Sequence, residues 1–245
     1  MGELKYQQEN QNPKERKEFI RDIFDDIVPT YDLLNRLLSA GIDRRWRRYL
    51  VSSSGDLKGK AVLDLCCGTG DLSRQLRGAG AEVYSLDFCF PMLEKGREKK
   101  WLDNLSVAAD ASKLPWRDSS FAMLTIAFGI RNIPDLQNLM NEACRVLEAG
   151  GRFRILELTR PASPLVGIFY KFYLSFFLPR VGGLISGRKQ AYRYLSSTIA
   201  TFLDPELLSS MLKEAGFGKV EVRKMTFGIA SIITAVKPSA SGDIA

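Results

Sequence analysis

The sequence predicts an α/β fold in which helices flank an open, mostly parallel β-sheet that ends in an antiparallel hairpin. Three observations predict it. Helical spacing fills the N-terminal part, short apolar runs alternate with amphipathic stretches through the middle, and two apolar runs near the C-terminus are joined by only a few residues. Parallel strands need long crossover connections, usually helices, whereas a short link joins antiparallel strands.

Amphipathic helices are expected from Pro13 to about Val51. The apolar residues recur there at the three- and four-residue spacing of a helix face, at Phe19, Ile23, Phe24 and Ile27 and then at Leu33, Leu34, Leu37 and Leu38. Pro29 separates the two groups, because proline removes a backbone donor and clashes with the preceding turn. Residues 14–55 are therefore expected to form a helical cap.

Seven apolar runs are expected to form the strands. Five of them, in the alternating part of the chain, are Ala61–Cys66, Glu82–Leu86, Leu105–Ala109, Phe121–Phe128 and Arg152–Leu158. The first four are each followed by a segment that can be helical. The last two, Phe217–Val222 and Ala230–Val236, enclose a stretch too short for a crossover helix, so they are expected to pair antiparallel.

The chain is expected to fold as one domain over residues 14–238. Its 245 residues, 45% of them hydrophobic, are enough for one sizeable core. The aromatic-rich residues 160–203 are expected to form a helical insertion that, with the N-terminal helices, covers the active site. Residues 1–13 and 239–245 offer little apolar surface to offset chain entropy, so we expect a disordered N-terminus and a flexible tail.

The composition excludes several kinds of site. No histidine is present, which removes imidazole as a general base or a metal ligand. The four cysteines, Cys66, Cys67, Cys89 and Cys144, form no Cys-x-x-Cys pair, so neither a zinc site nor a secreted disulfide framework is indicated and no metal is expected. The polar N-terminus lacks the apolar core of a signal peptide, and the apolar run 165–178 is too short to span a bilayer. A cytoplasmic protein is expected.

Residues 62–73 (VLDLCCGTGDLS) predict a buried strand, a glycine-rich turn and the start of a helix. Gly68 and Gly70 let a ligand pack against the main chain of the turn, beside Thr69. Asp64 precedes the turn within the strand. Asp87 ends the next strand, where a carboxylate can accept both ribose hydroxyls of an adenosine. The pattern predicts a cofactor that contains adenosine.

A dinucleotide site shares this turn and this acid, but the residues around the turn favour S-adenosylmethionine. Ser73 replaces the third glycine of the dinucleotide pattern, and the first strand carries Asp64 just ahead of the turn. Asp71 at the helix start would repel a pyrophosphate. The chain also has no Tyr-x-x-x-Lys pair of the kind that short-chain dehydrogenases use. Asp110, with its neighbour Ala111, ends the third strand and is expected to lie beside the adenine.

Residues 24–46 (FDDIVPTYDLLNRLLSAGIDRRW) and 128–132 (FGIRN) resemble the demethylmenaquinone and ubiquinone-pathway C-methyltransferase family. The resemblance runs from about residue 17 to 238 and includes the segments 178–182, 192–199, 216–217 and 225–229. It implies a Rossmann-like class I methyltransferase sheet. It also implies methyl transfer from S-adenosylmethionine to a ring carbon of a polyprenylated quinol, in menaquinone biosynthesis, ubiquinone biosynthesis or both. The cofactor contacts that it implies fall on Thr69, Asp87, Asp110 and Ala111, while Ala127 stands where the family commonly has serine.

A quinol ring carbon becomes nucleophilic when the adjacent hydroxyl, with a pKa near ~10 by analogy with tyrosine, loses its proton. Arg131 follows the fourth strand, at the carboxyl edge where open α/β sheets bind ligands. Since a guanidinium is a poor proton acceptor, Arg131 is expected to stabilise the phenolate or to polarise a water. Asn132 is expected to orient that water or a quinol oxygen, and Tyr31 to close over the ring.

The substrate also suggests contacts outside the chemistry. Six aromatic residues are expected to line a channel for the prenyl tail. They are Phe169, Tyr170, Phe172, Tyr173, Phe176 and Phe177. The alternative is that they belong to an ordinary helix buried on the sheet. The net charge of +7 and a basic cluster around Trp46 predict peripheral contact with a membrane, although a solvated helix face explains the cluster nearly as well. The cluster comprises Arg44, Arg45, Arg47 and Arg48. A homo-oligomer and a complex with other biosynthetic enzymes are both compatible with the sequence.

Two alternatives differ in acceptor or in activity. The protein is either a methyltransferase for another acceptor, such as RNA or a sterol-like small molecule, or a non-catalytic, cofactor-binding component of a quinone biosynthetic complex. Against RNA, and against any nucleic-acid partner, the chain lacks the Pro-Cys pair of cytosine-5 enzymes and the Asp-Pro-Pro-Tyr motif of amino-methylating enzymes. The Asp64-to-Asp87 region together with Arg131 and Asn132 favours activity.

Overall fold

A computed structural model of the protein describes residues 13–29, 31–159, 161, 163–177, 180, 198 and 204–239. Most of the predicted terminal segments and of the insertion predicted for 160–203 lie outside these residues. Of the disordered N-terminus predicted for 1–13 only Pro13 is described, and it is helical; of the tail predicted for 239–245 only Ser239 is described. Most of the segments 178–182 and 192–199 that carried part of the family resemblance also lie outside the described residues.

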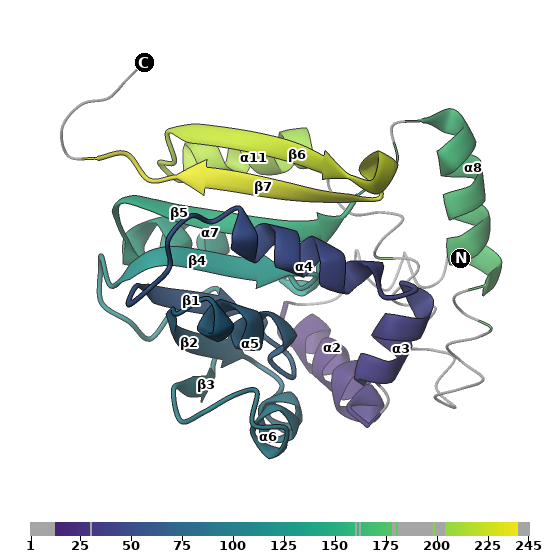
Figure 1. The fold of residues 1–245 in the computed structure, drawn as a ribbon, viewed down its shortest axis with the longest axis horizontal. Helices are drawn as coiled ribbons and strands as arrows, with labels where there is room; N and C mark the ends of the chain where they lie inside the picture. The colour runs from purple at the N-terminus through teal and green to yellow at the C-terminus, as the bar shows by residue number, and fades with distance from the viewer. Residues whose placement is uncertain are drawn as a thin grey trace.

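In the described part of the chain, seven strands form one sheet in the order β3-β2-β1-β4-β5-β7-β6 (Figure 1). The strands are β1 (Ala61–Leu65), β2 (Glu82–Asp87), β3 (Ser106–Ala108), β4 (Phe121–Ala127), β5 (Leu147–Leu158), β6 (Lys219–Met225) and β7 (Ala230–Val236). Strands β1 to β5 pair in parallel, whereas β7 pairs antiparallel with both β5 and β6. The predicted parallel sheet with a C-terminal antiparallel hairpin is confirmed.

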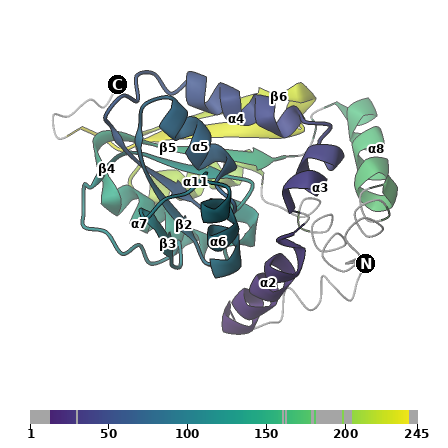
Figure 2. The ribbon, with the colours of Figure 1, turned by 60° about the horizontal axis from the view of Figure 1, so that its bottom comes forward.

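Helices cover both faces of this sheet (Figures 1 and 2). They are α2 (Pro13–Ile27), α3 (Tyr31–Leu38), α4 (Ile42–Ser52), α5 (Asp71–Gly78), α6 (Phe90–Glu98), α7 (Leu136–Val146), α8 (Pro164–Phe172) and α11 (Pro205–Glu214), with the short helices η1 (Ile130–Asn132), η2 (Tyr173–Phe177) and η3 (Thr226–Gly228). Alternate residues of a strand face opposite sides. Val62 accordingly belongs to the apolar cluster of α4 and α5, and Leu63 to that of α7 and α11.

The parallel strands point their carboxyl ends towards α2, α3 and α8, which lie together at one end of the molecule (Figures 1 and 2). An apolar cluster joins these helices to α6. Its buried members are Ile20, Ile23, Cys89, Met92 and Leu174. Since open α/β sheets bind ligands at the carboxyl ends of their strands, these helices are positioned over the candidate site.

Three details of the predicted elements were wrong. Residues 109–120, after β3, form turns and bends instead of a crossover helix. The N-terminal part forms three helices instead of two, because Ala40 and Gly41 adopt positive φ angles of 49° and 73° and end the second helix before α4. Strand β6 begins at Lys219 and not at Phe217, whose buried ring packs into the core beside Phe153.

The connection after β4 depends on a close approach of two backbones. A Cβ added to Gly129 would lie 2.4 Å from the Cβ of Cys66, in the turn after β1. We expect Gly129→Ala to lower the free energy of unfolding by about 1–3 kcal/mol, measured by urea denaturation. Gly167→Ala is the matched control, because no atom of the described residues lies within 4 Å of the added Cβ and alanine favours a helix. Equal stability of the two variants would contradict this packing.

Candidate active site

The turn between β1 and α5 forms the floor of the site. Its residues Cys66, Gly68 and Gly70 all adopt positive φ angles, of 51°, 56° and 88°. A Cβ on Gly70 would lie 2.7 Å from the side chain of Leu102, so a glycine is needed for packing behind the turn. A Cβ on Gly68 would meet only Tyr31 within 4 Å, at 3.7 Å, so this backbone is open towards the site. The two glycines therefore serve different purposes.

Asp87, at the end of β2, is held by the backbone of two neighbouring segments. The N–H of Gly68 donates to its Oδ2 at 2.7 Å, and the N–H of Cys89 donates to its Oδ1 at 2.9 Å. Burial raises the pKa of this carboxyl to about 6, although the backbone donors lower it. Each carboxylate oxygen can accept a second hydrogen bond, so the ribose hydroxyls predicted here still find acceptors.

Asp64, which the sequence placed just before the turn, is held by two hydroxyl groups. Its Oδ2 accepts from the hydroxyl of Ser73 at 2.6 Å, and its Oδ1 accepts from the hydroxyl of Thr125 at 2.8 Å. Only 1% of its surface is exposed, and burial raises its pKa to about 6. Asp64 thus ties β1 to α5 and β4 beneath the turn and contributes one edge of the site.

Helix α3 lies over the turn and is fastened to it by Asp32. The hydroxyl of Thr69 donates to Asp32 Oδ1 at 2.7 Å, and Lys99, just after α6, forms an ion pair with Oδ2. Tyr31, the first residue of α3, packs edge-on against Phe24 of α2 with 6.1 Å between ring centroids. Two N-terminal helices therefore cover the cofactor turn, as the predicted helical cap would.

Two adjoining cavities lie between this cover and the strand ends. The polar cavity is lined by Tyr31, Asp32, Arg47, Asp64, Cys66, Cys67, Thr69, Asp71, Leu72 and Ala127. The aromatic cavity is lined by Phe24, Tyr31, Cys66, Gly68, Asp87, Phe88, Met92, Ala127, Phe128, Gly129 and Asn132. Tyr31, Cys66 and Ala127 border both. The site therefore offers a charged compartment beside one of aromatic and apolar side chains.

These compartments fit the two ends of S-adenosylmethionine. In the polar cavity, Oδ1 of Asp71 is buried and has no hydrogen-bond partner among the described residues, so it suits the ammonium group of the methionine part. In the aromatic cavity, Asp87 suits the ribose and Phe88 lies beside it in the chain. Asp32, Arg47, Asp71, Phe88 and Met92 were not predicted as site residues. Of these, only Asp71 had a local signal, its place at the start of α5.

The three predicted catalytic residues lie at different depths. Tyr31 borders both cavities and Asn132 borders the aromatic one. Arg131, in η1, lines neither cavity. It is 8% exposed, and its guanidinium forms an ion pair with Glu157 of β5, which has no exposed surface. Sequence reasoning missed Glu157, because an acid inside a strand carries no local signal of its partner.

The residues predicted beside the adenine line neither cavity. Asp110 follows β3, and its Oδ1 accepts from the backbone N–H and the hydroxyl of Ser112 at 2.9 and 2.7 Å. Ala111 is 5% exposed and packs into the core. Contact of these two residues with the adenine therefore stays a prediction.

The basic cluster around Trp46 is divided between the surface and the interior. Arg45 and Arg48 are exposed and Arg44 is half-buried, so lipid contact through these arginines stays a prediction. Trp46 is buried and its indole N–H donates to the hydroxyl of Thr226 at 2.9 Å. Arg47 is also buried, pairs with Asp43 at 2.5 Å and stands over the ring of Phe128, 4.8 Å from its centroid. These two side chains are held inside the protein, and Arg47 serves the polar cavity.

The predicted aromatic channel residues divide into two groups. Tyr170 and Tyr173 are partly buried and pack against the cluster that contains Phe24 and Tyr31. The side chains of Phe169, Phe172, Phe176 and Phe177 are between 49 and 70% exposed. Only the two tyrosines therefore face the site.

Comparisons with known proteins agree with this geometry. The model of the ubiE/COQ5 methyltransferase family matches residues 10–237. The chain is 45% identical over 221 residues to the demethylmenaquinone methyltransferase of Thermus thermophilus, which covers 88% of this chain and 100% of that protein. It is 39% identical over 241 residues to the ubiquinone/menaquinone biosynthesis C-methyltransferase UbiE of Pseudomonas paraeruginosa, with 95% and 93% covered.

Solved structures share the fold at low identity. One is phosphoethanolamine N-methyltransferase 2 of Haemonchus contortus in complex with S-adenosyl-L-methionine, with a TM-score of 0.58, 18% identity, and 78% of this chain and 52% of that chain covered. Another is a SAM-dependent methyltransferase from Aquifex aeolicus, with a TM-score of 0.53, 16% identity, and 78% and 88% covered.

The fold and the paired cavities define a class I methyltransferase, the class that uses S-adenosylmethionine as its methyl donor. Within that class, the chain belongs to the ubiE/COQ5 methyltransferase family. It is an S-adenosylmethionine-dependent C-methyltransferase, which confirms the enzyme class and the family that the sequence indicated.

Proposed function

We propose that the protein methylates a ring carbon of a polyprenylated quinol, with demethylmenaquinol as its substrate. The observation that carries this proposal is the aromatic cavity at the strand ends. Part of its wall includes Asp87, which suits the ribose of the donor. Another part is formed by Phe128, Gly129 and Asn132, after β4, where a flat apolar ring can lie beside the bound donor. The choice of demethylmenaquinol is supported by the Thermus relative, which is matched over its full length and is named for that reaction.

The residues of the site divide the work between binding and activation. S-adenosylmethionine, when bound, supplies a methyl group on a positively charged sulfur. Asp87 and Asp71 are the acceptors for the ribose and for the ammonium group of that donor. Asn132 and Tyr31 border the cavity on the side of the ring, where their side chains can orient it. The positive charge of Arg131, behind Asn132, favours the phenolate form of the quinol.

A methylation assay tests this proposal and its alternatives. The purified protein is incubated with labelled S-adenosylmethionine and with reduced demethylmenaquinone, 2-polyprenyl-6-methoxy-benzoquinol or total RNA. We expect label in demethylmenaquinol, and label in the benzoquinol as well would extend the substrate to ubiquinone biosynthesis. Label that appears only in RNA would overturn the quinol proposal. Tight binding of S-adenosylmethionine without transfer to any acceptor would instead indicate a non-catalytic component.

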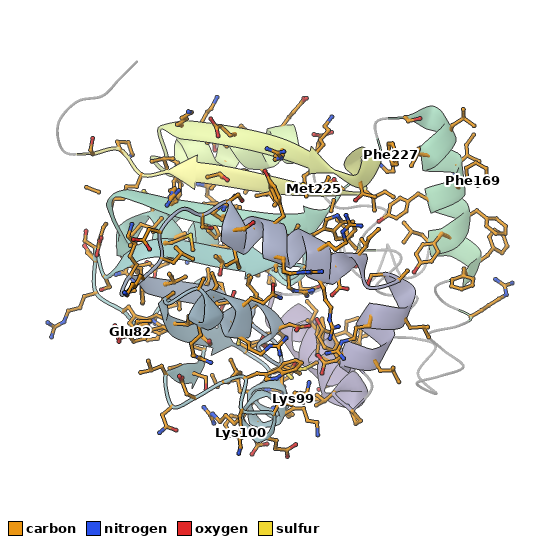
Figure 3. The ribbon with its side chains drawn as sticks, in the orientation of Figure 1. Glu82, Lys99, Lys100, Phe169, Met225 and Phe227 are labelled. Atoms are coloured by element: carbon orange, nitrogen blue, oxygen red, sulfur yellow. The ribbon has the colours of Figure 1, made fainter. Side chains whose placement is uncertain are left out.

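The prenyl tail of the substrate leads to a second proposal, peripheral contact with a membrane through α8. No helix in the described ranges is long and apolar enough to cross a bilayer. Yet Leu165, Ile168, Phe169 and Phe172 of α8 are each 62–70% exposed, at helical spacing. Figure 3 shows Phe169 projecting from α8 at the end of the molecule that holds the site. An exposed apolar helix face beside basic residues is typical of interfacial membrane binding, and α8 carries Lys171.

Changing two of these residues tests the membrane contact. We expect Phe169→Ser with Phe172→Ser to weaken partitioning onto anionic liposomes by on the order of 100-fold, because each phenylalanine contributes about 1.5–3 kcal/mol when buried. Sedimentation with the liposomes at low salt measures this. Leu207→Ser is the matched control, since Leu207 is 48% exposed on α11, which covers the sheet. Recovery of the unaltered protein entirely in the supernatant would contradict the contact.

A further inference from the structure

Arg131 and Glu157 form a buried ion pair. Both act on the phenol of Tyr170, whose pKa is raised mainly by burial, so the three polar side chains form one cluster. Within the described residues, three buried polar atoms of this cluster have no hydrogen-bond partner: Nε of Arg131, Oε2 of Glu157 and Oη of Tyr170. Buried polar atoms are nearly always paired, because an unmade hydrogen bond inside a protein costs free energy. Three such atoms in one cluster indicate a place for a polar group that comes from outside the chain.

The cluster adjoins the residues that line the aromatic cavity. Tyr170 packs against the same buried apolar cluster as Phe24, Tyr31 and Phe88, three residues that line this cavity. Cys66, which borders both cavities, has a thiol pKa that is raised mainly by burial and further by nearby carboxylates, among them Asp87 and Glu157. A ring in the aromatic cavity therefore has the cluster next to one of its edges.

The three atoms match a hydroxyl group in number and in kind. A phenolic hydroxyl donates one hydrogen bond and accepts others. Oε2 of Glu157 is an acceptor, Nε of Arg131 is a donor, and Oη of Tyr170 can act as either. A single ring hydroxyl can therefore satisfy the cluster.

Resting on the proposed function, we infer that Glu157 is the general base that takes the proton of the quinol hydroxyl. The O–H bond breaks and its proton passes to Oε2 of Glu157, while the electron pair stays on the ring oxygen and increases the electron density at the ring carbon. The new C–C bond forms as the bond between sulfur and the methyl carbon breaks, and that electron pair remains on sulfur. Loss of the hydrogen of the ring carbon as a proton restores the aromatic ring, and the ring oxygen takes a proton back from Glu157, so one proton is released overall.

Other groups of the site are less suited to this role. A guanidinium is a poor proton acceptor, so Arg131 holds the carboxylate and stabilises the phenolate. Both oxygens of Asp87 accept from backbone N–H groups, and both oxygens of Asp64 accept from hydroxyls. Burial raises the pKa of Glu157, although Arg131 and backbone donors lower it, and a raised pKa makes a carboxylate a stronger base. Arg131, Tyr170 and Cys66 are the titratable groups of the described residues that face it.

Single-turnover methylation of demethylmenaquinol by Glu157→Gln, over the range from about pH 5 to pH 9, tests the inference. S-adenosylmethionine is kept saturating at every pH, so that protonation of Asp87 does not affect the rate. The rate of the unaltered protein is expected to fall on the acid side, where Glu157 becomes protonated. Glu157→Gln is expected to be on the order of 10²–10⁴-fold slower and to lack this acid-side decline, with unchanged affinity for S-adenosylmethionine. Glu142→Gln, which removes the carboxylate of another Arg–Glu pair, at 2.6 Å on α7, is expected to keep both the rate and the decline.

Three results would overturn the inference. If the unaltered protein methylates quinols and Glu157→Gln has the same rate and the same pH profile, the role of Glu157 is overturned and the proposed function stands. An unaltered protein that methylates no quinol would overturn the proposed function as well. Where Glu157→Gln does not fold, Glu157→Asp decides, because it keeps the charge beside Arg131 but withdraws the carboxylate from the ring. That variant is expected to be about tenfold slower or more, and a rate equal to that of the unaltered protein would contradict a base at this position.

Discussion

Arg131→Ala is expected to lower kcat by about 10²–10³-fold, the loss typical of removing one group that stabilises a developing anion. The affinity for S-adenosylmethionine is expected to stay close to that of the unaltered protein, because Arg131 lines neither cavity and lies behind Asn132. Steady-state kinetics with demethylmenaquinol and calorimetric titration with S-adenosylmethionine measure the two quantities separately. An unchanged kcat would remove Arg131 from the mechanism.

The same substitution carries a cost in stability that must be separated from the chemistry. Alanine leaves Glu157 fully buried without its cation, which costs about 3–5 kcal/mol in comparable pairs. The double variant Arg131→Met with Glu157→Leu removes both charges and is expected to recover most of the free energy of unfolding, measured by urea denaturation. Its kcat is expected to stay low. A double variant that recovers activity together with stability would mean that the pair has only a structural role.

The layout of the sheet could be predicted because it depends on local sequence periodicity. The alternation of apolar runs and helical stretches predicted the parallel strands, and the short link after β6 predicted the hairpin. The segment after β3 was predicted as a helix because its composition permits one, whereas Asp110 and Ser112 form a turn through their side chains. Side-chain capping of this kind competes with helix formation.

The cofactor turn could be predicted, but the groups that complete the site could not. Gly68 and Asp87 belong to one strand-turn-helix pattern, and that pattern is visible in a short stretch of sequence. Asp32 reaches Thr69 from α3, and Glu157 reaches Arg131 from the neighbouring strand. Such pairs are set by the packing of distant elements, and a single sequence contains no record of them.

The basic cluster was predicted from neighbouring residues without regard to helix faces. Helical spacing turns Trp46 and Arg47 inward and leaves Arg45 and Arg48 exposed, so only part of the cluster can meet a lipid surface. Residues three or four positions apart share a helix face, so adjacent arginines do not. The exposed apolar face instead belongs to α8, where the sequence suggested a channel.

Asp87→Ala is expected to weaken the binding of S-adenosylmethionine by on the order of 100-fold, since hydrogen bonds to a charged group contribute about 1.5–3 kcal/mol. Two effects act together: the ribose loses its acceptor, and the N–H groups of Gly68 and Cys89 lose the carboxylate that holds the turn. Asp56→Ala is the matched control, because its carboxylate also accepts a backbone N–H, at 3.0 Å from Lys58, but on the exposed loop before β1.

The pH dependence of binding separates Asp87 from a general loss of structure. Its pKa is about 6 in the unliganded protein, and the ribose hydroxyls favour the ionised carboxylate. Affinity for S-adenosylmethionine in the unaltered protein is therefore expected to be constant well above pH 6 and to decline as the pH falls through 6. Asp87→Ala has no carboxylate to protonate at this position. Its affinity is expected to be lower at every pH but to fall less steeply than that of the unaltered protein as the pH drops through 6. Calorimetric titration on both sides of this pH measures the difference. An equal decline of affinity in both proteins would assign the titration to another group. Asp64, whose pKa is also about 6, would then be the next residue to substitute.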